Sequence, residues 1–185
     1  MKKWMIGTMT ALVVLMMATA ACRKKVQPVD AKSLLRTGID YDKAGNYAEA
    51  VRYYREAAMM GLSEAQNNLG VMYKDGQGVA QDYAEAVRWF KEAAEQGNVL
   101  AQSNLGWMYQ SGSGVAQDYS EARHWYLLAA CVGHAAAQNN LGTMYRDGQG
   151  VVPNEDSARY WFSQAAAKGM QLARRNLEKL DSLAP

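Results

Sequence analysis

A fifteen-residue motif occurs three times in this chain, and its regular spacing restricts the possible folds more than any other feature. The copies begin at Ala65, Ala101 and Ala137, so each starts 36 residues after the one before it. A repeat of this length typically forms a pair of helices that cannot bury its apolar face alone and is stabilised by stacking on its neighbours. The sequence therefore predicts an all-α solenoid, whose extended surface favours binding over catalysis in a single pocket.

The first helix of each copy is predicted from an apolar stripe. In the copy that begins at residue 65, the stripe consists of Ala65, Leu69, Met72 and Tyr73. These residues recur at the helical period, so we expect them to be buried. Gly70 lies within the stripe, where a larger side chain would block the partner helix, and the same position is held by Gly106 and Gly142.

The second helix of this copy is predicted to span residues 83–96, after a loop that contains Gly76 and Gly78. Glycine tolerates the positive φ that such a turn needs. Asp82 is expected to cap this helix, because its carboxylate can accept hydrogen bonds from the first N–H groups. The counterparts of Asp82 are Asn46, Asp118 and Asn154, and the predicted inward side chains are Ala86, Trp89, Phe90, Ala93 and Ala94.

The N-terminal residues are predicted to direct export. Lys2 and Lys3 precede an uncharged apolar run that ends at Ala18, as in a secretory signal peptide, and the run is short for a membrane span. The small residues that follow lead to Cys22 and resemble a bacterial lipobox, although Thr19 stands where that pattern usually has Leu. The resemblance implies that Cys22 carries a lipid, such as palmitate, and becomes the mature N-terminus. Ordinary signal-peptidase cleavage after Ala20 is the alternative.

The lipobox resemblance also suggests a location. No acidic residue follows Cys22 in the short tether, whereas an Asp there often marks lipoproteins retained at the inner membrane. We therefore expect a lipid anchor at the outer membrane, facing the periplasm. The expected organisation is a signal peptide at 1–21, the lipidated cysteine and tether at 22–32, repeats at 33–64, 65–100, 101–136 and 137–172, and a capping helix at 173–185.

The repeats resemble the Sel-1-like family, a longer relative of the tetratricopeptide repeat. The shared pattern is Ala-x-x-x-Leu-Gly-x-x-Tyr, then Gly-x-Gly-Val, Asp-Tyr-x-x-Ala and Trp-Phe/Tyr-x-x-Ala-Ala-x-x-Gly. It covers three complete copies, and the shorter copy at 33–64 is closer to a tetratricopeptide unit. Glu155 departs from the pattern, which has Tyr after the cap. The resemblance implies a right-handed α/α superhelix whose concave face binds a protein or peptide, here one of the cell envelope.

Charge and chemistry exclude several other classes of function. After the signal the chain carries 18 basic and 18 acidic residues, so it lacks the basic excess that binding to nucleic acid requires. His124, His134 and Cys131 stand at positions where other copies have different residues, so we expect neither a metal site nor a catalytic group, and no cofactor. The protein is predicted not to be an enzyme. A cell-wall enzyme or a glycan-binding accessory subunit is the alternative, although Trp89, Trp125 and Trp161 share one position and are expected in the core.

A candidate binding strip lies on the first helices, opposite the buried stripe. Positions two, six and nine residues after the leading small residue point away from the core at 100° per residue, and they vary between copies. Trp107 is the expected anchor, because tryptophan is enriched among binding hot spots; packing of Trp107 on the adjacent helix is the alternative. The candidate partner-binding residues are Ile39, Val71, Lys74, Trp107, Gln110, Thr143 and Arg146, and the other positions of the strip are Leu35, Asp42, Asn67, Ser103 and Asn139.

Overall fold

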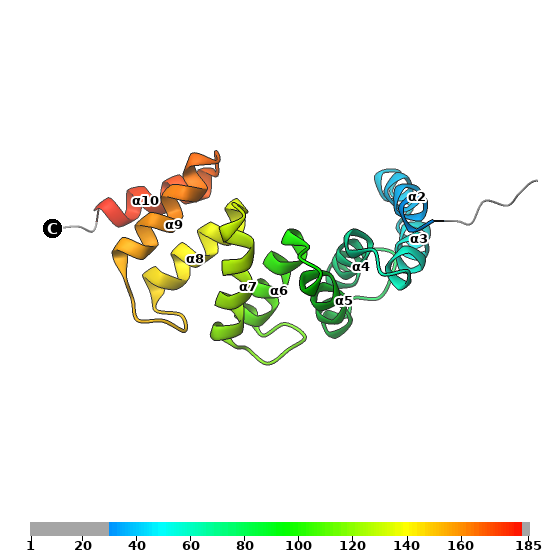
Figure 1. Cartoon of the computed structure of the whole chain (residues 1–185), viewed down its shortest axis with the longest axis horizontal. Coiled ribbons are helices and arrows are strands. Elements are labelled where there is room, and N and C mark those ends of the chain that lie inside the picture. The colour runs from blue at the N-terminus through cyan, green and yellow to red at the C-terminus, as the bar shows by residue number, and fades with distance from the viewer. Residues whose placement is uncertain (1–29, 183–185) are drawn as a thin grey trace, which may run out of the picture. The chain divides into compact units, whose positions relative to one another are not determined.

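Nine helices make up residues 30–182, the part of the chain that this computed structural model describes (Figure 1). In chain order they are α2 (Ala31–Lys43), α3 (Tyr47–Met59), α4 (Ser63–Asp75), α5 (Tyr83–Glu95), α6 (Val99–Ser111), α7 (Tyr119–Cys131), α8 (Ala135–Asp147), α9 (Glu155–Ala167) and α10 (Gln171–Ser182). No strand occurs among these residues. The main contacts join consecutive helices, so each helix pairs with the one before it and the one after it. The predicted all-α solenoid of helix pairs is confirmed.

The helices are of two alternating types, and both bury the predicted side chains. We call α2, α4, α6, α8 and α10 the first helices, and α3, α5, α7 and α9 the second helices. On α4, Ala65, Leu69 and Met72 are buried, and Tyr73 is half-buried against the core. On α5, all five inward side chains expected from the sequence are buried. The apolar period alone therefore identified the packed faces of both helix types.

A glycine allows each pair to close. A Cβ atom at Gly106 would lie 2.7 Å from the Tyr126 ring, which is closer than packed carbon atoms approach. Gly70 and Gly142 lie in the same way against Phe90 and Phe162. The expectation that these glycines face the partner helix is confirmed.

The loop between the two helices of a repeat packs on the preceding repeat. Gly78 has a φ of 70°, and a Cβ atom there would lie 2.3 Å from the carbonyl carbon of Tyr47, the first residue of α3. Equivalent glycines of the later loops lie against Tyr83 and Tyr119. In the described part of the chain no such loop packs on α9, which begins with Glu155 in place of Tyr. The departure from the repeat pattern at Glu155 therefore coincides with the missing loop contact.

Helix capping follows the prediction at three of four positions. The Asp82 carboxylate accepts hydrogen bonds from the N–H groups of Ala84 and Glu85, both at 3.0 Å, and Asp118 and Asn154 also accept bonds from the start of their helices. Asn46 makes no such bond, so its predicted role is wrong. The backbone of Asn46 (φ −86°, ψ 64°) is not in the extended conformation that Asp82 adopts, because the loop in the first copy is shorter.

The predicted signal and the lipidation residue Cys22 lie outside the described residues. None of the helices between residues 30 and 182 has the length and apolar character of a transmembrane span.

Candidate functional site

The candidate partner-binding residues occupy two positions on the first helices. The sixth position after the leading small residue holds Ile39, Val71, Trp107 and Thr143, and the ninth holds Asp42, Lys74, Gln110 and Arg146. Trp107 is exposed, with 43% of its surface accessible, and the other seven side chains are half-buried. Its ring is therefore available to a partner, in contrast to Trp89 and Trp125, which are buried and cannot stack on a sugar.

The second position of the predicted strip does not belong to this surface. Asn67, Ser103 and Asn139 are all less than 10% exposed, so the expectation that they face solvent is wrong. The reason is the next repeat: the Asn104 side-chain amide donates to the Asn67 carbonyl at 3.1 Å, and Asn176 donates to Asn139 at 2.9 Å. Position two faces the following first helix, and a helical wheel of one repeat does not reveal that neighbour.

Two of the four repeat junctions are organised around a tyrosine of the second helix. The Tyr54 hydroxyl donates to the Asp42 carboxylate at 3.2 Å, and the Tyr126 hydroxyl donates to the Gln110 side chain at 2.8 Å. Asn68 and Asn140, on the following first helices, lie beside these hydroxyls. Burial raises the pKa of both phenols, so they remain neutral donors. We call these two sites the tyrosine junctions.

Phe90 and Phe162 replace the tyrosine at the other two sites, the phenylalanine junctions. Without a hydroxyl group, the asparagine of the following helix bonds to the preceding first helix, as Asn104 does with Asn67. The ninth position changes as well: Lys74 and Arg146 stand where the tyrosine junctions have the acceptors Asp42 and Gln110. The two junction types alternate along the array, so the polarity of the strip is coupled to the packing beneath it.

The two cations of the strip are neutralised by their neighbours. The Lys74 ammonium lies 2.5 Å from the Asp75 carboxylate, and the Arg146 guanidinium lies 2.6 Å from Asp147. Hydrogen bonding from Arg146 lowers the pKa of the Asp147 carboxyl below its usual value, so the pair stays ionised near neutral pH. These residues offer polar contacts to a partner without a strong local charge.

A cavity of about 230 Å³ lies at the first tyrosine junction. It brings together Ile39 and Val71 of the predicted strip, although they belong to different helices. Its lining residues are Ile39, Asp42, Lys43, Tyr54, Asn68, Val71, Met72 and Gln77. At the second tyrosine junction the Gln110 side chain accepts a hydrogen bond from Tyr126 and donates one to Gln149, the latter at 2.7 Å. The hydrogen-bonded side chains of Gln110 and Gln149 therefore lie where the first tyrosine junction has its cavity.

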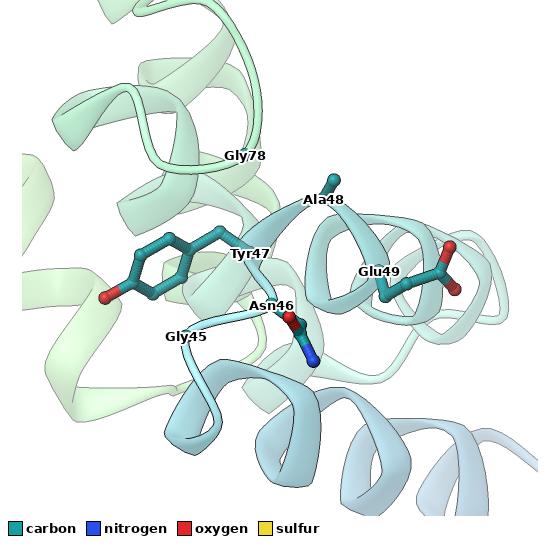
Figure 2. Close-up of a pocket in the computed structure, with 6 residues that line it drawn as sticks. All are labelled: Gly45, Asn46, Tyr47, Ala48, Glu49 and Gly78. Carbon is teal, nitrogen blue, oxygen red and sulfur yellow. The ribbon is translucent and has the colours of Figure 1, made fainter.

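A second hollow, of about 420 Å³, lies at the start of α3 beside the Gly78 loop (Figure 2). Figure 2 shows the Tyr47 and Glu49 side chains pointing in opposite directions from the first turn of the helix. The Glu49 carboxylate is engaged by Arg52 at 2.9 Å. This hollow therefore presents no free charged group to a ligand.

Histidine and cysteine do not gather into a reactive site in the described part of the chain. His124 and the thiol of Cys131 are exposed, and no group of three metal-ligating side chains occurs within residues 30–182. His134 is half-buried and its ring caps α8: Nδ1 accepts a hydrogen bond from the Ala137 N–H at 3.3 Å. Burial lowers the pKa of His134, so the ring is largely neutral and can accept this bond.

Comparison with known proteins identifies the repeat. The family model described as Sel1 repeat matches residues 31–62, 63–98, 99–134 and 135–170. A Sel1 repeat protein from Oxalobacter formigenes is 35% identical, with a TM-score of 0.78 over 88% of this chain and 68% of that chain. The protective antigen c5321 of uropathogenic Escherichia coli, which displays an SLR fold, is 40% identical with a TM-score of 0.75. That match covers 78% of this chain but spans only 32% of c5321.

A more distant structure shares the fold alone. The cysteine-rich protein B of Helicobacter pylori is 23% identical, with a TM-score of 0.56 over 71% of this chain and 95% of that chain. No curated protein matches the sequence.

Proposed function

The chain belongs to the Sel1 repeat family, whose members generally act as non-catalytic scaffolds in protein–protein interactions, and from this premise we propose that it is an envelope-anchored adaptor. Its binding surface consists of the sixth and ninth positions of the first helices. We call this surface the A-strip: Ile39, Val71, Trp107 and Thr143, with Asp42, Lys74, Gln110 and Arg146. The partner is a protein or peptide of the cell envelope.

The exposure of Trp107 is the main support for the binding proposal. An indole with 43% of its surface in water has a large apolar area that no contact within the repeat covers, and burying it on a partner is favourable. Val71 and Thr143 stand at the same position of the neighbouring first helices. A partner that lies across α4, α6 and α8 would contact all three.

Photo-crosslinking in cells tests this surface. A benzophenone amino acid is introduced at position 107 in one variant and at position 128 in the other; Leu128 is 41% exposed but belongs to the second helix α7. We expect a protein adduct from position 107 and none from position 128. The same adducts from both positions, or adducts from position 128 alone, would show that the A-strip is not the binding surface.

The proposed anchor is a lipid on Cys22, and the apolar run before this cysteine supports it. One acyl chain binds membranes only marginally, so stable anchoring requires more than one chain on the mature N-terminus. Cys22→Ser should prevent incorporation of labelled palmitate and release the protein into the soluble periplasmic fraction. Membrane association that persists in the variant, with no label in the wild type, would disprove lipid anchoring.

A further inference from the structure

We propose that the cavity at the first tyrosine junction binds a lysine or arginine side chain of the partner, with the alkyl part against Ile39, Val71 and Met72 and the charged end at Asp42. This inference rests on the proposed function, because two of the three apolar walls belong to the A-strip. It adds the chemical class of ligand that one place on the A-strip selects.

The walls of the cavity fit the alkyl part of a long basic side chain. Ile39 of α2 and Val71 of α4 are half-buried, and Met72, which also lines the cavity, is buried in the core. Lysine and arginine commonly pack their methylene groups on apolar surfaces and keep the charged end at a polar rim. A cavity of about 230 Å³ that is lined by these apolar side chains and by the Asp42 carboxylate has the size and chemistry for such a side chain.

The negative charge of Asp42 in the cavity lining favours a cation. The Asp42 carboxylate accepts a hydrogen bond from Tyr54, and it takes part in no ion pair among residues 30–182. Lys43 also lines the cavity, but it is not paired with Asp42. At residues 42 and 43 the acidic residue precedes the basic one. At the phenylalanine junctions the basic residue, Lys74 or Arg146, comes first and is paired with the acidic residue that follows it. Asp42 is therefore a carboxylate of the A-strip with remaining capacity for a basic group.

The second tyrosine junction lacks the carboxylate that a cation site needs. Gln110 replaces Asp42 there, and its side chain accepts from Tyr126 and donates to Gln149. Both ends of the amide are thus occupied within the chain, and the residue carries no charge. The partner is expected to place its basic residue at the N-terminal end of the array, two first helices away from Trp107.

The test uses the full-length chain in detergent micelles with ¹³C-methyl methionine. The probe is Nα-acetyl-lysine amide, and the neutral control of equal length is Nα-acetyl-norleucine amide. We expect the lysine probe to shift the methyl resonance of Met72 saturably and to leave that of Met144, the equivalent residue of α8, unchanged. Equal responses to the two probes, or a response at Met144 and not at Met72, would overturn the proposal.

Two variants of neighbouring residues test the role of charge. Asp42→Asn keeps an acceptor for Tyr54 but removes the negative charge, and we expect about tenfold weaker binding of the lysine probe, the scale of one charge-assisted hydrogen bond. Lys43→Gln removes a competing cation and should bind the probe at least as tightly as the wild type. Unchanged affinity in Asp42→Asn, or weaker binding in Lys43→Gln, would contradict a cation site.

The outcome separates this inference from the proposed function. Adducts at position 107 together with a silent Met72 resonance would leave the A-strip as the binding surface and reject the cation pocket. A saturable Met72 response without adducts at position 107 would support the pocket and reject Trp107 as a contact of the protein partner.

Discussion

At the scale of single residues, the polar groups between repeats follow a rule that one repeat alone does not reveal. Where the second helix carries Tyr54 or Tyr126, the hydroxyl donates to the ninth position of the preceding first helix, and the asparagine of the next first helix lies beside it. Where it carries Phe90 or Phe162, that asparagine bonds to another asparagine across the first helices. The buried side chains of Asn67, Asn139 and Asn176 thus keep a hydrogen-bond partner, which matters because an unpaired buried polar group is costly.

Removal of one hydroxyl tests this rule. Tyr126→Phe deletes the 2.8 Å hydrogen bond to Gln110, so we expect a loss of about 1 kcal/mol in the free energy of unfolding. Tyr160→Phe is the matched control, because that ring is exposed on α9. Denaturant unfolding measures both variants. Equal stability of Tyr126→Phe and the control would show that the hydroxyl does not stabilise the junction.

At the scale of elements, the sequence predicted what depends on a helix and its own partner. The stripe with Leu69, the close approach at Gly106 and the cap at Asp82 all follow from local period and local chemistry, and the structure confirms them. Asn46 was mispredicted because a shorter loop changes the backbone at the cap, which residue type alone does not report. Residue identity thus predicts a cap only when the loop before it has the same length.

Only part of the candidate strip was predicted correctly, because the period of one helix does not show which residues the next repeat covers. Trp107 is exposed as its period indicates, but Asn67 and Asn139 are buried against the next repeat. The signal that could have revealed this is a correlation between copies: asparagine stands at position two where the second helix has Phe, and Leu35 or Ser103 stands there where it has Tyr. The cavity beside Asp42 depends on side-chain packing among three helices, so sequence period could not predict it.

At the scale of the whole molecule, the described helices form an array in which each element depends on its neighbours. The loop glycines pack each repeat on the one before, and asparagine pairs join α4 to α6 and α8 to α10. Stability in such arrays is approximately a sum of repeat and interface contributions. The sixth position varies between copies, from Ile39 to Trp107, while buried residues such as Leu69 and Leu105 recur. A recurring core combined with a varied sixth position suits a protein whose role is recognition.

The central claim, that the A-strip binds the partner through Trp107, is tested most directly by the affinity of Trp107→Ala for the protein recovered by crosslinking. Calorimetric titration should show a loss of at least about 2 kcal/mol, roughly 30-fold in Kd, because exposed tryptophans at interfaces act as hot spots. Thermal unfolding of the same variant should differ from the wild type by no more than about 0.5 kcal/mol, the usual range for a surface substitution. Full affinity in Trp107→Ala would contradict the claim, and a parallel loss of stability and binding would show that the ring is structural.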